Sequence, residues 1–85
     1  MKTQKANWAA EAVGWYGTVA ILIAYASVSF GWLTSDNLIF QLLNFTGAIG
    51  IVIISLLKKA YPPATLNIIW SIIALVALIG MLMRL

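Results

Sequence analysis

The chain has 85 residues, of which 64% are hydrophobic and 8% are charged. Soluble domains are about 25% charged, and so short a chain cannot cover this much apolar side chain with polar surface, so the composition excludes an ordinary soluble domain and predicts an integral membrane protein. The lack of cysteine and histidine excludes disulfides and Cys/His metal sites, and five scattered basic residues, for a net charge of +3, are too few for a nucleic-acid-binding surface.

Three uncharged stretches follow one another along the chain, at residues 12–35, 37–57 and 60–83. A helix needs about 20 apolar residues to cross the roughly 30 Å hydrocarbon core of a bilayer, and each stretch is long enough. Three strands could not close a barrel, so strands are excluded. The sequence predicts an all-α fold, an integral membrane three-helix up-down-up bundle that forms a single domain.

The first transmembrane helix is expected at residues 12–33, after a cytoplasmic N-terminal segment at 1–11. A cleaved signal peptide is the less favoured alternative, because this apolar run extends well past the usual 7–15 residues. Gly31 lies where a helix end often needs a residue that is free to adopt positive φ.

The second and third transmembrane helices are expected at residues 37–57 and 63–83. Thr34–Asn37 supplies four good N-cap residues for the second helix, and Lys58 and Lys59 suit the negative end of its dipole. Pro62-Pro63 interrupts the chain and is tolerated in the first turn of the third helix. Both connections are short, which favours antiparallel neighbours.

The basic residues predict the orientation in the membrane. Lys2, Lys5, Lys58 and Lys59 fall on one side, whereas only Arg84 falls on the other. By the positive-inside rule we expect the N-terminus to be cytoplasmic and Asp36 and the C-terminus to lie outside, in a bacterial inner (plasma) membrane.

Each expected span carries polar or small residues at helical spacing. Such residues meet protein rather than lipid, because lipid-exposed polar groups are costly. The candidates for lining a solute site are Gln41, Asn44, Asn67, Trp70, Thr18 and Tyr25. The candidates for helix packing are Gly14, Gly17, Gly47, Gly50, Ala74 and Ala77. The alternative for the polar candidates is also packing, in which amides bond across helices and hold the bundle in register.

The sequence predicts no catalytic site, no metal site and no cofactor. No charged residue lies deep in a span, where proton relays and ion pathways usually place one. No serine or threonine has a base beside it, and no phosphate-binding loop is present. We therefore do not expect an enzyme.

Several sequence blocks resemble a family of small, uncharacterised bacterial membrane proteins with three spans. The blocks are Tyr16-Gly17-Thr18, Gln41-Leu42-Leu43-Asn44-Phe45-Thr46-Gly47-Ala48, Lys59-Ala60-Tyr61-Pro62 and Leu66-Asn67-Ile68-Ile69-Trp70. The resemblance extends roughly from Tyr16 to Leu75. It implies the three-span architecture and no established activity.

A more distant resemblance is to the half-SWEET and PQ-loop transporters, three-helix units that pair around a transport pathway. In that family an asparagine of the third helix lines the pathway, and Asn67 is similarly placed after Tyr61-Pro62. The first span lacks the Pro-Gln pair, and the first loop carries Asp36 where those proteins are basic.

Two classes of function are consistent with the sequence. The first is a half-transporter that forms a homodimer around a site for a small uncharged polar solute, because three helices alone cannot enclose a pocket of about 300–1,000 Å³. Glycine and alanine pairs on every span would serve contacts within and between protomers. The second is a non-transporting structural or assembly subunit of a larger membrane complex. With either function, the protein would lie in the lipid bilayer.

Overall fold

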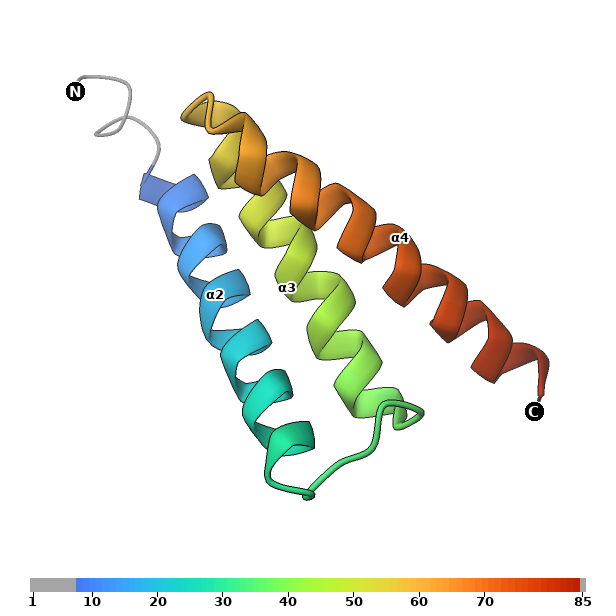
Figure 1. Cartoon of the computed structure of the whole chain (residues 1–85). Coiled ribbons are helices and arrows are strands. Elements are labelled where there is room, and N and C mark those ends of the chain that lie inside the picture. Colours follow the sequence, from blue (N-terminus) through green and yellow to red (C-terminus); the bar gives the residue numbers. More distant parts are fainter. Residues whose placement is uncertain (1–7, 85) are drawn as a thin grey trace.

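The computed structural model describes residues 8–84 and consists of three long α-helices (Figure 1). These are α2 (Trp8–Ser29), α3 (Leu38–Leu57) and α4 (Tyr61–Met83). Each is long and apolar enough to cross a membrane, and no strand occurs within residues 8–84. The predicted all-α fold with three candidate spans is confirmed, and it indicates a multi-pass membrane protein.

Helix α2 ends through a C-terminal capping motif centred on Gly31. Gly31 has φ +80°, the left-handed conformation that glycine adopts without a steric penalty. The Trp32 amide donates to the Ser27 carbonyl oxygen at 2.8 Å, and the Gly31 amide donates to the Val28 carbonyl oxygen at 3.1 Å, which together form a Schellman motif. The motif ends the helix at Ser29.

Helix α3 is capped at both ends. At its start the Asn37 side chain accepts a hydrogen bond from the Phe40 amide at 3.2 Å. At its end the Ala60 amide donates to the Ser55 carbonyl oxygen at 2.8 Å and the Lys59 amide to the Leu56 carbonyl oxygen at 3.1 Å, a second Schellman motif. Lys59 takes the left-handed position with φ +57° although it is not a glycine.

The helices differ from the expected spans mainly at three ends. Helix α2 begins at Trp8 and not at residue 12, because Ala9 and Ala10 favour helix and Glu11 suits the positive end of the dipole. It also ends before residue 33, at the Gly31 motif. Helix α4 begins at Tyr61 and includes both prolines, since the first-turn amides of a helix have no partner within it. Most of the predicted segment 1–11 lies outside the described residues.

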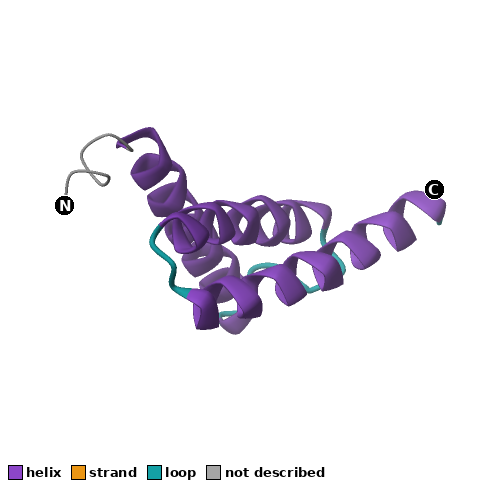
Figure 2. Cartoon of the chain, turned by 90° about the horizontal axis from the view of Figure 1, so that it is seen from above, coloured by secondary structure: helices purple, strands orange, loops and turns teal. Residues whose placement is uncertain are grey.

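Helix α3 is the central helix. It packs against α2 on one face and against α4 on another, whereas α2 and α4 make no contact with each other. Figure 1 shows neighbouring helices running antiparallel and spreading apart from the end that holds the α3–α4 turn, and Figure 2 shows the same opening from above. The order is up-down-up, but the three helices do not close around a common axis.

The sequence of α3 explains this arrangement. Gly47 and Gly50 face α2, while the buried residues Ala48 and Ser55 belong to the neighbouring face. Successive residues on a helix are about 100° apart, so the two packing faces of α3 are adjacent sides of one cylinder. Helices α2 and α4 pack on these two sides of α3 and do not contact each other.

Candidate functional site

A close approach between α2 and α3 depends on four glycines. A Cβ added at Gly50 would lie 2.6 Å from the Val13 carbonyl oxygen, and one added at Gly17 would collide with the Gly47 carbonyl oxygen. A Cβ at Gly14 would lie 2.6 Å from Ile54 Cγ2. Gly14, Gly17, Gly47 and Gly50 therefore all lie in one contact within the chain.

The position of the four glycines removes one reason to expect a homodimer. The glycine pairs exceed what one helix contact needs by sequence alone, which predicted that some of them would contact a second copy. The α2–α3 contact occupies all four glycines. On α4, Ala74 is buried and Ala77 is half-buried. Small residues on α2 and α3 thus give no remaining support for dimerisation.

Two side-chain bridges also join α2 to α3. Lys58 Nζ lies 2.7 Å from Glu11 Oε2, where the two helices meet beside the α3–α4 turn. Tyr16 Oη lies 2.6 Å from Thr46 Oγ1. Since the single Thr46 hydroxyl hydrogen is donated to the Leu42 carbonyl oxygen at 2.7 Å, Tyr16 is the donor of this bond. Both bridges were missed from the sequence, although the topology places Glu11 and Lys58 at one end.

The three amides that were candidates for a solute site are all buried. Asn67 is 7% exposed, and its Nδ2 donates to the Pro63 carbonyl oxygen at 2.9 Å. Gln41 is 9% exposed; its Nε2 donates to the Ser35 carbonyl oxygen at 2.8 Å, and its Oε1 is buried without a partner. Asn44 is 8% exposed. Gln41 and Asn67 therefore direct their donors to nearby backbone.

Four polar side chains in the helices donate hydrogen bonds to backbone carbonyls of their own helix. Thr18 Oγ1 donates to the Gly14 carbonyl oxygen at 3.1 Å, and Ser71 Oγ donates to the Asn67 carbonyl oxygen at 2.6 Å, each four residues back. Thr46 and Asn67 follow the same pattern. Among residues 8–84 no amide bonds across helices, so the expected cross-helix amide bonds are not seen. For Asn67 the reason is that the carbonyl four residues back is within reach of a short polar side chain.

The remaining candidates are less buried than the amides. Tyr25 is 69% exposed, Trp70 is 38% exposed and Thr18 is half-buried. A cavity of about 260 Å³ between α2 and α3 includes Thr18 together with Glu11, Trp15, Ser55 and Lys58 in its wall. None of Gln41, Asn44, Asn67, Trp70 or Tyr25 lines it. The six candidates are thus not gathered around this cavity.

A second cavity of about 360 Å³ lies at the opposite end of the molecule. Its wall consists of Asp36, Leu38, Met81, Leu82 and Arg84, from the α2–α3 loop, the start of α3 and the end of α4. None of the six candidates lines it either. No sequence pattern predicts this cavity, because its two charged residues are 48 positions apart and only the fold places them in one wall.

The model of a known protein family matches residues 10–84, which is most of the chain. The chain belongs to this family, which is uncharacterised. The match agrees with the resemblance to small uncharacterised proteins and gives no support for a relation to half-SWEET or PQ-loop transporters. No curated protein and no solved structure matches the chain significantly.

Proposed function

We propose that the protein is a non-transporting structural or assembly subunit of a larger membrane complex, in a bacterial inner membrane with its N-terminus in the cytoplasm. The observation that carries this proposal is the placement of the polar groups. Asn67, Ser71 and Thr18 direct their donors to backbone carbonyls of their own helices. These donors are therefore occupied without a bound solute, which supports a role in helix packing.

A solute site has the opposite arrangement. It needs a concave pocket in which a few polar groups converge on the ligand. Here the deep amides Asn44 and Asn67 are at least nine-tenths buried, and neither lines the cavity at either end of the bundle. The polar residues of α3 and α4 therefore fit helix packing better than recognition of a solute.

The half-transporter is the second candidate, and one observation favours it. Helices α2 and α4 make no contact, so one flank of α3 stays open between them within a single copy. Tyr25 and Trp70 are exposed. A second copy could close this opening around a small uncharged polar solute.

The composition of the native assembly tests the proposal. The tagged chain would be isolated in a mild detergent from membranes that express it at its native level, and the mass of the intact assembly would be measured. We expect a second polypeptide at fixed stoichiometry. Gly50→Ala, which disturbs the α2–α3 contact, should release that polypeptide, whereas Gly80→Ala should retain it.

The two candidates differ in the result. A homodimer with no second polypeptide would reject the subunit proposal and favour the half-transporter. A monomer in lipid at native expression would reject both.

A further inference from the structure

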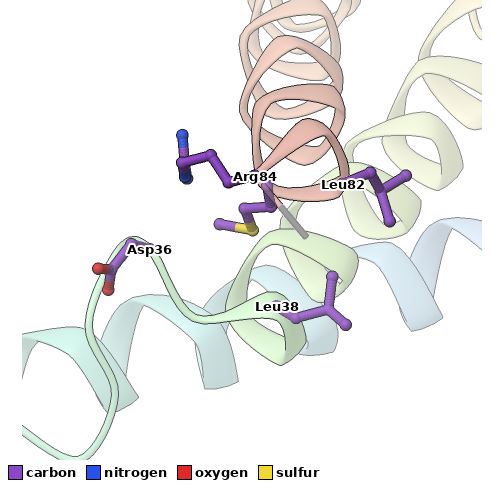
Figure 3. A pocket seen from close by; sticks show the side chains of 5 residues that line it. Asp36, Leu38, Leu82 and Arg84 are labelled. Atoms are coloured by element: carbon purple, nitrogen blue, oxygen red, sulfur yellow. The ribbon is translucent and has the colours of Figure 1, made fainter.

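The wall of the cavity beside Arg84 contains side chains of opposite charge and several apolar side chains. Asp36 and Arg84 line one part of it, and Leu38, Met81 and Leu82 line the rest (Figure 3). Figure 3 shows the Asp36 carboxylate and the Arg84 guanidinium on the same side of the cavity with space between them. The cavity thus presents an anion, a cation and an alkyl-binding surface together.

The Arg84 side chain turns back along its own helix. A Cβ added at Gly80, one turn earlier, would lie 3.4 Å from Arg84 Nη1, so the guanidinium rests over the glycine. A charged side chain at the end of a span normally extends toward water. A guanidinium that lies beside the last turn of a span is placed to meet an anionic group near the membrane surface.

Among residues 8–84 the Asp36 carboxylate has a hydrogen-bond donor but no basic partner. Thr34 Oγ1 donates a hydrogen bond to Asp36 Oδ1. Within residues 8–84 the structure has an ion pair between Glu11 and Lys58 and none between Asp36 and Arg84, although both line the cavity. The two charges are therefore available to a ligand that carries one charge of each sign.

We propose that this cavity binds the head group of a zwitterionic phospholipid, with its phosphate on Arg84 and its ammonium on Asp36. Helix α3 begins at Leu38 and α4 ends at Met83, so the cavity lies where two candidate spans reach the membrane surface. Arginine matches phosphate oxygens with paired donors. The acyl chains enter the opening between α3 and α4 over Leu38 and Leu82.

The apolar side chains of the cavity favour a lipid over a soluble zwitterion. A free phosphoethanolamine would satisfy Asp36 and Arg84 but would leave Leu38, Met81 and Leu82 uncovered. A phospholipid covers both parts of the cavity. Ethanolamine is preferred to choline as the cation, because a primary ammonium donates hydrogen bonds to a carboxylate and a quaternary ammonium does not.

Native mass spectrometry of the full-length protein tests the proposal. Micelles would carry equal amounts of phosphatidylethanolamine, phosphatidylcholine and phosphatidylglycerol with matched acyl chains. We expect phosphatidylethanolamine to be retained roughly two- to fivefold more than either other lipid, the range for one partly exposed charge pair. Asp36→Asn should abolish this preference, and Arg84→Gln should lower the retention of all three lipids.

The controls separate charge from folding. Arg84→Lys keeps the charge and should retain most of the binding, and Lys59→Gln, at the opposite end of the bundle, should leave it unchanged. Equal retention of the three lipids by the parent, or Asp36→Asn and Arg84→Gln variants that bind like it, would overturn the proposal. Displacement of the lipid by free phosphoethanolamine at the same concentration would show a soluble zwitterion site and overturn the lipid assignment.

Discussion

At Gly50 the backbones of α2 and α3 leave no room for a methyl group. The added Cβ of Gly50→Ala would lie 2.6 Å from the Val13 carbonyl oxygen, and backbone cannot move aside as a flexible side chain can. We expect the substitution to lower the free energy of unfolding by about 1–3 kcal/mol, the usual cost of overpacking. Unfolding in mixed micelles of increasing sodium dodecyl sulfate content would measure the change.

Gly80→Ala is the matched control for this substitution. Its Cβ would meet only the end of the flexible Arg84 side chain, at 3.4 Å. Alanine also favours helix over glycine by roughly 0.5–1 kcal/mol. We expect no loss of stability or a small gain, and equal losses at Gly50 and Gly80 would argue against the close α2–α3 approach.

The Tyr16–Thr46 hydrogen bond lies on an exposed surface that would face lipid. Polar contacts between transmembrane helices average about 0.6 kcal/mol and reach about 1.7 kcal/mol. Tyr16→Phe and Thr46→Val should each lower stability in this range. In a double-mutant cycle the combined variant should lose little more than either single one, and strictly additive losses would show that the bond does not form.

At the scale of the element, the turn between α3 and α4 contains a strained residue. Lys59 has φ +57°, which costs a residue with a side chain roughly 1–2 kcal/mol. Lys59→Gly should therefore raise the stability of the protein by about 1 kcal/mol. Thermal unfolding in a fixed detergent would measure the gain.

Lys59→Ala separates the backbone effect from the charge. Alanine removes the ammonium as glycine does but keeps the Cβ, so it should bring no gain. At the corresponding position of the other Schellman motif, Gly31→Ala should lower stability by a similar amount, because Gly31 has φ +80°. An equal gain for Lys59→Ala and Lys59→Gly would assign the effect to charge.

Local sequence signals predicted the ends of the helices better than their packing. Gly31 and Asn37 were identified as a helix end and an N-cap because each acts on backbone within a few residues. The start of α2 at Trp8 was missed because Lys5 and Glu11 marked that region as polar. The Tyr16–Thr46 contact and the Asp36–Arg84 cavity depend on which faces of the helices meet, and no local pattern records that.

The candidate site illustrates the same limit. Helical spacing placed Gln41, Asn44 and Asn67 on protein-facing stripes, and all three are buried. The same stripes included Tyr25 and Trp70, which are exposed. Helical spacing could not decide between bonds across helices and bonds to the same helix. The structure shows Asn67 bonded to its own helix, through Pro63.

At the scale of the whole molecule, the distribution of basic residues predicts the orientation. A reporter fused after residue 85 should read as outside the cytoplasm, and one inserted after Lys59 should read as cytoplasmic, because Lys58 and Lys59 lie in the second turn region. Reporter activity in intact cells would measure both. The reverse pattern would place Asp36 and Arg84 in the cytoplasm.

We infer that the deep amides lie in dry contacts between helices of one protomer. The chain contains no cysteine, so single cysteines can replace Asn44 and Asn67 in turn and be exposed to a membrane-impermeant thiol reagent in permeabilised membranes. Asp36→Cys, in an exposed loop, gives the labelling rate of an accessible site. We predict that Asn44→Cys and Asn67→Cys stay unlabelled until the protein is unfolded in denaturing detergent. Labelling of both in the folded protein at rates near that of Asp36→Cys would reveal a hydrated cavity and contradict the claim.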